Sequence, residues 1–88
     1  MYDVRWTERA DNELAQLWML AKSQMRAAIN AAANEIKRQL KSDPLVVGES
    51  RGEGERIAFE YPLGISFHVE SERFVIVGHV WSIVRRGS

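Results

Sequence analysis

The chain has 88 residues, so we expect one domain over residues 1–88, with a small core and a narrow stability margin. Its composition, 45% hydrophobic and 27% charged, is that of a folded domain and excludes a disordered tail. The absence of cysteine excludes disulfides and thiol catalysis, and the net charge of zero argues against a surface that is basic throughout, although it is compatible with a local basic patch.

The first residues predict a strand that leads directly into a helix. Over residues 2–7, apolar Tyr2, Val4 and Trp6 alternate with polar residues, which is the period of a half-buried strand. Thr7 then occupies the position of a helix N-cap. The apolar residues that follow have helical spacing: Leu14, Leu17, Trp18 and Ala21. The charged start is unlike a signal peptide, and no apolar run reaches the length of a membrane span.

A second, longer helix is predicted to end at Asp43, with Ser23 as its N-cap. Its apolar stripe consists of Met25, Ile29, Ala32, Ala33, Ile36 and Leu40. The helix ends at Asp43 because the residue before a proline is disfavoured in the helical region. Two adjacent helices with so short a link are expected to form an antiparallel hairpin.

Residues 45–55, "LVVGESRGEGE", have neither helical nor strand periodicity and are predicted to be a loop. The glycines do not form a phosphate-binding loop, because the G-x-x-x-x-G-K-[ST] spacing is missing. The segment also runs from a helix to a strand, the reverse of the order that points a helix N-terminus at a phosphate. We therefore expect a connection between the helices and a sheet.

Three β segments follow: 56–61, where Ile57, Phe59 and Tyr61 form the apolar face, then 65–69 and 74–81. Short polar turns between them predict a three-stranded antiparallel meander. The last segment is apolar on both faces, so it should be a central strand with the helices covering at least one side. The fold class is therefore α+β, with a strand, a helical hairpin and the meander in two layers.

This order resembles the RelE/ParE superfamily, the toxins of bacterial type II toxin–antitoxin systems. The resemblance rests on "YDVRWTERADNEL", on "SDPLVVGESR" and on the meander "RIAFEYPLGISFHVESERFVIVGHVW", and it spans nearly the whole chain. It implies neutralisation by a cognate antitoxin. RelE-like members imply metal-independent mRNA cleavage on the ribosome, whereas ParE-like members imply binding to DNA gyrase without catalysis.

The resemblance directs attention to basic residues at the start and end of the meander. A ribonuclease needs such cations to stabilise charge on the phosphate, and a proton carrier, for which His68 is suitable if it faces the same groove as Arg56. The candidate catalytic residues are therefore Arg56, His68 and Arg85, and the candidate target-binding residues are Arg51, Arg56 and Arg86. The alternative is that Arg51 and Arg56 are solvated and only balance nearby glutamates, and that Arg85 and Arg86 belong to a frayed basic terminus.

The sequence departs from the ribonuclease pattern at "PLGISF". Gly64 or Ile65 stands where those enzymes carry an arginine, which removes a bidentate phosphate contact, and no tyrosine follows the last strand. This departure favours a ParE-like toxin slightly over a RelE-like ribonuclease. An inactive interaction module with the same fold is the third alternative.

His79 alternates with Val75, Val77 and Trp81, so we expect it in the core or in an interface. Most aromatic side chains are likewise expected to be packing residues: Trp6, Trp18, Phe59, Phe67, Phe74 and Trp81. With two histidines and no suitable spacing, no metal is expected, and no cofactor.

The expected partners are an antitoxin, which should cover an exposed apolar patch, and either the ribosome with its mRNA or DNA gyrase. A homodimer is left open. No membrane partner is expected, and the location is expected to be cytoplasmic.

Overall fold

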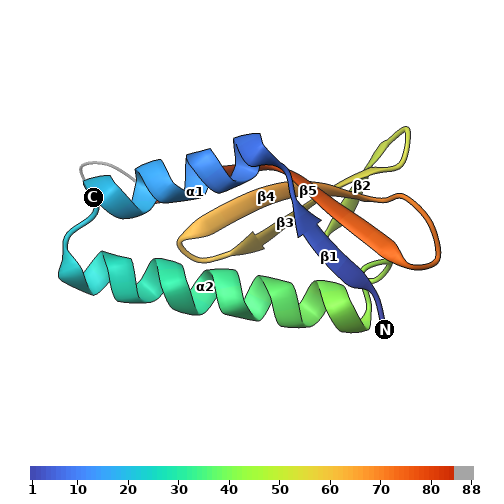
Figure 1. The fold of residues 1–88 in the computed structure, drawn as a ribbon, viewed down its shortest axis with the longest axis horizontal. Coiled ribbons are helices and arrows are strands. Elements are labelled where there is room, and N and C mark those ends of the chain that lie inside the picture. The colour runs from blue at the N-terminus through green and yellow to red at the C-terminus, as the bar shows by residue number, and fades with distance from the viewer. Residues whose placement is uncertain (85–88) are drawn as a thin grey trace.

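A computed structural model describes residues 1–84 as a five-stranded sheet with two helices packed on one face (Figure 1). The elements in chain order are β1 (Asp3–Trp6), α1 (Glu8–Leu20), α2 (Ser23–Ser42), β2 (Glu49–Gly52), β3 (Glu55–Glu60), β4 (Leu63–Val69) and β5 (Phe74–Ser82). The strand order is β1-β5-β4-β3-β2, with β1 parallel to β5 and the other pairs antiparallel. The predicted two-layer α+β class is confirmed.

Local signals in the sequence set most helix ends. The Thr7 hydroxyl accepts a hydrogen bond from the Ala10 N–H at 3.1 Å, as an N-cap should. The predicted Ser23 cap is wrong: Ser23 is the first residue of α2, and the cap is Lys22, whose side chain makes no capping bond. Lys22 is the last extended residue, so the helix begins at Ser23, one residue earlier than a Ser23 cap requires. α2 ends at Asp43 as predicted.

The segment predicted to be a loop contains β2, so the meander has four strands and not three. Gly52, Glu53 and Gly54 all have positive φ, which closes a tight turn and folds β2 back on β3. Every residue of β2 is exposed. An edge strand without a buried face has no hydrophobic alternation, which is why the sequence pattern did not reveal it.

The helix-facing side of the sheet forms the core. Its buried members are Ala10, Ile29, Ala32, Ala33, Ile36, Leu40, Ala58, Leu63, Ile65, Phe67, Val75, Val77 and Val80. The face predicted for β3 is inverted, because Ala58 points toward the helices while Ile57 and Phe59 point away. The small side chain of Ala58 leaves room for α2 to approach. Nε2 of Gln39 on that helix donates a hydrogen bond to Oε1 of Glu60 at 3.3 Å.

A bulge in β5 changes which of its residues face the helices. Ser66 of β4 pairs with His79 while Phe67 pairs with Val77, so Gly78 is an extra residue. His79 is therefore on the face away from the helices, together with Trp81, and the prediction that it belongs with Val75 and Val77 is wrong. The interior place predicted for this strand is confirmed, since β5 lies between β1 and β4.

Within residues 1–84, no helix is both long and apolar enough to span a membrane. The same residues contain no group of three His, Asp or Glu side chains arranged to hold a metal ion.

Candidate functional site on the outer face of the sheet

We call the side of the sheet opposite the helices the outer face. Its residues form three rows across β3, β4 and β5, because directly paired residues share a face. The rows are Phe59–Gly64–Trp81, Ile57–Ser66–His79 and Glu55–His68–Ile76. The middle strand carries small side chains in two of these rows, and Ser66 is only 6% exposed because larger neighbours shield it.

An aromatic pair dominates the first row. The rings of Phe59 and Trp81 meet edge to face, with centroids 6.3 Å apart and an interplanar angle of 82°. Phe59 is 58% exposed, so it is an exception to the expectation that most of these aromatic side chains are packing residues. Of the aromatic residues in the predicted packing set, Phe67 is the one that is fully buried within residues 1–84, at 1% exposure.

Gly64 makes this arrangement possible. A Cβ atom built on Gly64 would lie 2.5 Å from Nε1 of Trp81 and 2.6 Å from its Cε2. The indole therefore lies across the backbone of β4, in space that any other residue at position 64 would occupy. Gly64 thus has a structural role here, since its missing side chain makes room for the indole.

The arginines on this side of the sheet have neighbouring carboxylates. Arg5 lies over the Phe74 ring, 4.4 Å from its centroid, and its NH2 nitrogen is 3.3 Å from Oδ2 of Asp3. Arg51 on β2 is 3.8 Å from Oε2 of Glu49. Exposed pairs of this kind add little stability, but each places a carboxylate beside the positive charge of its arginine.

The structure does not bring Arg56 and His68, two of the predicted catalytic residues, together. Arg56 pairs with buried Phe67 and points to the helix side, whereas His68 pairs with Glu55 on the outer face. The guanidinium of Arg56 instead donates to the backbone carbonyls of Val47, at 3.1 Å, and Gly48, at 3.2 Å. The expectation of one groove shared by Arg56 and His68 is wrong, since a one-residue offset places two side chains on opposite faces.

The remaining predicted site residues are scattered or not described. Arg51 is on the exposed edge strand β2. Arg85 and Arg86 lie outside the described residues. None of these positions tests the roles that the sequence suggested.

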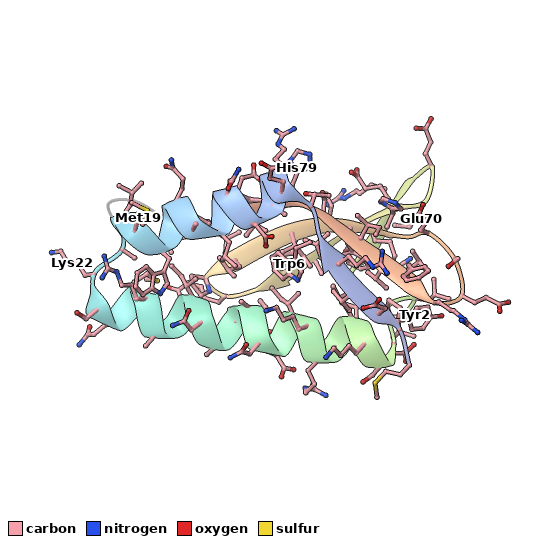
Figure 2. The ribbon with its side chains drawn as sticks, in the orientation of Figure 1. Tyr2, Trp6, Met19, Lys22, Glu70 and His79 are labelled. Carbon is pink, nitrogen blue, oxygen red and sulfur yellow. The ribbon has the colours of Figure 1, made fainter. Side chains whose placement is uncertain are left out.

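Glu13 of α1 forms a link to β5 that the sequence did not predict. Its Oε1 accepts the Val80 N–H at 3.0 Å, and its Oε2 lies 3.8 Å from Nδ1 of His79. Figure 2 shows His79 beside the first turns of α1. The link depends on the bulge at Gly78, which turns His79 toward α1, so no local sequence pattern could have revealed it.

A cleft of about 750 Å³ lies next to this link. One wall is α1, and the other is the end of β5; it is lined by Glu8, Arg9, Asn12, Glu13, Gln16, Leu17, Val80, Trp81 and Ser82. Trp81 belongs both to this cleft and to the aromatic pair of the outer face. The cleft and the outer face are therefore adjacent.

No protein-family model and no curated protein sequence matches the chain. Among solved structures, it is similar to a chain of the chromosomal ParDE TA system from P. aeruginosa, with a TM-score of 0.74 and 16% identity over 96% of this chain and 98% of that one. It is also similar to a chain of the RelBE2 toxin–antitoxin complex from Mycobacterium tuberculosis, with a TM-score of 0.71 and 22% identity over 92% and 90%. The isolated E. coli RelE toxin gives a TM-score of 0.64 and 19% identity over 99% and 89%. At such identities the likeness concerns the fold, which these structures and this chain share.

Proposed function

We propose that this chain, which has the fold of RelE/ParE toxins, is the growth-inhibiting toxin of a type II toxin–antitoxin system and acts by binding a protein target. The observation that supports binding most directly is the aromatic pair on the outer face, formed by exposed Phe59 and half-buried Trp81. Exposed aromatic side chains beside polar residues are typical of the centre of a protein interface. The fold likeness supports the cognate antitoxin as the second partner, and the location proposed is the cytoplasm.

The charge distribution favours binding over RNA cleavage. A ribonuclease of the RelE kind stabilises the phosphate with several cations. Here Arg56 is bonded to backbone carbonyls on the helix side, and Arg5 and Arg51 lie beside carboxylates. Gly64 makes room for Trp81 but has no side chain that could carry a positive charge. The neighbours in structure include both ParDE and RelE proteins, so DNA gyrase and the ribosome are the two targets to test first.

The first experiment is inducible expression in a bacterial host. We expect the natural chain to arrest growth, and the protein encoded by the neighbouring gene to relieve the arrest when both are expressed. Trp81→Ala should weaken the arrest at least tenfold, measured as surviving colonies. Val46→Ala is the matched control, because Val46 is a 73% exposed apolar residue on the turn after α2 and away from the outer face. If the natural chain is harmless while soluble, it is an inactive module with this fold.

The second experiment separates the two mechanisms. The purified chain is added to translating ribosomes, and the mRNA ends are mapped. We expect no cleavage. If cleavage occurs and disappears in Arg56→Gln with the fold intact, the chain is a ribonuclease and the binding mechanism is wrong.

A further inference from the structure

Strand β5 extends beyond the strand next to it. β1 pairs with β5 from Asp3 opposite Phe74 to Trp6 opposite Val77, and the chain then turns into α1. β5 continues to Ser82. Among residues 1–84, no strand pairs with this last part of β5 on the side opposite β4. The sheet therefore has an open edge at residues 80–82.

The backbone groups at this edge point away from β4. The Ile83 N–H donates to the Pro62 carbonyl at 3.0 Å, on the β4 side. The Val80 N–H points the other way, to Glu13. Because alternate residues of a strand direct their N–H and C=O groups to the same side, the Ser82 N–H and the carbonyls of Val80 and Ser82 also face away from β4. They face the cleft between β5 and α1.

These backbone groups indicate what kind of chain binds in the cleft. An unpaired strand edge pairs with another extended chain, whereas a helix has already satisfied its own backbone groups. The opposite wall carries Asn12 and Gln16, one helical turn apart, and neither side chain makes a hydrogen bond within residues 1–84. Their amides can donate and accept, so they suit the outer edge of an inserted strand. The Val80 N–H is already bonded to Glu13, so the cleft offers the Ser82 N–H and the carbonyls of Val80 and Ser82 to one edge of an extended segment, and the two amides to the other.

We propose that an extended segment of the antitoxin adds to β5 at residues 80–82 and thereby covers Trp81. This inference rests on the proposed function. A residue paired with Trp81 would lie on the outer face, about 5 Å from it between Cβ atoms, and would contact the indole. The segment therefore has an apolar residue at that position. Neutralisation follows directly, because the inserted strand occupies one side of the aromatic pair that binds the target.

Hydrogen exchange of single backbone amides tests this placement. The probe is the protein encoded by the neighbouring gene, added to the full chain. We expect the Ser82 amide to exchange rapidly in the free chain and at least tenfold more slowly in the complex. The Gly54 amide, in the exposed turn between β2 and β3, is the control and should not change. Unchanged exchange at Ser82 in a formed complex overturns the proposal, as does the absence of a complex.

A pair of substitutions tests the role of the backbone donor. Ser82→Pro removes the N–H that faces the cleft, in a position where the ladder to β4 does not use it. Ser82→Ala keeps the N–H, and both variants lose the bond from the Val84 N–H to the Ser82 hydroxyl. We expect Ser82→Pro to bind the probe at least tenfold more weakly than Ser82→Ala. Equal affinities overturn the proposal. If Ser82→Pro does not fold, Asn12→Leu with Gln16→Leu replaces it, with the same expected loss.

Two further outcomes are distinguishable from failure of the proposed function. Protection of the Ser82 amide in the free chain that rises with protein concentration would show that a second copy occupies the edge, and the antitoxin assignment would be wrong. Growth arrest by the natural chain is measured separately. If the chain arrests growth, the toxin function holds even where the strand placement is wrong. If the chain does not arrest growth, the toxin function is refuted, whatever binds at β5.

Discussion

Replacement of Gly64 by alanine gives the sharpest test of how the outer face is built. The new Cβ would lie 2.5 to 2.9 Å from three atoms of the Trp81 indole, closer than any real contact of this kind. The indole must therefore leave its position across β4, and its edge-to-face contact with Phe59 is lost. An overpacked site costs about 1–3 kcal/mol. The lost aromatic contact accounts for about 0.5–1.5 kcal/mol of the same loss.

Two effects reduce this cost. The indole can swing toward solvent, since the outer face carries no helix, and alanine is better than glycine in a strand by about 0.5–1 kcal/mol. We expect a net loss of about 1–2 kcal/mol in the free energy of unfolding. For a domain of this size, that lowers the melting temperature by about 4–16 °C. Urea unfolding followed by circular dichroism measures it, and growth arrest by the same variant should weaken.

A double-mutant cycle and a matched glycine provide the controls. In a Trp81→Ala background, Gly64→Ala should cost nothing, because no indole remains to be displaced. Gly78→Ala on β5 should be neutral or slightly stabilising, since a Cβ there meets nothing within 4 Å and the glycine has no positive φ. If Gly64→Ala is as stable as the natural chain, or loses as much stability without Trp81 as with it, the role assigned to Gly64 is wrong.

Three other predictions concern the cap, the core and the surface. Thr7→Ala should lower the free energy of unfolding by about 1 kcal/mol through loss of the N-cap, whereas Thr7→Ser keeps it; equal stabilities would contradict the cap. Leu40→Ala, at a fully buried position, should cost about 2–5 kcal/mol, while Leu20→Ala, 82% exposed, should change stability by less than about 0.5 kcal/mol; similar losses would contradict the assigned core. The hydrogen bonds from Arg38 lower the pKa of Glu35 to about 2 from 4.5, so this pair contributes stability above pH 4.5 that is lost as the pH falls toward 2. Urea titrations from pH 6 to pH 2 should show a smaller acid loss for Arg38→Met than for the natural chain, and an identical loss would contradict the pairing.

Local patterns in the sequence predicted the elements that have their own signals. The alternation before Thr7, the threonine cap and the proline after Asp43 each act through neighbouring residues, and each predicted boundary holds within a residue or two. Strand β2 has no such signal. It exists because the turn at 52–54 folds it onto β3, and its sequence alone would also suit a loop.

The site was harder to predict because it depends on which face of the sheet each side chain occupies, and the pairing between strands sets that face. A single extra residue at Gly78 places His79 on the outer face with Trp81 and not on the face of Val75 and Val77. A one-residue offset in register likewise separates Arg56 from His68. Neither effect is visible in one strand, since each is a property of a pair of strands. The family resemblance predicted the fold correctly but did not predict that Gly64 makes room for Trp81.

The parallel pairing of β1 with β5 has a consequence for synthesis of the chain. The Thr7 hydroxyl donates to the Gly78 carbonyl across 71 positions, and Asp3 pairs with Phe74, so the first strand has no partner in the sheet until residues 74–77 have been made. Contacts between such distant segments form late and slowly. A chain cut short in translation before β5 therefore lacks both the partner of β1 and the aromatic pair of the outer face.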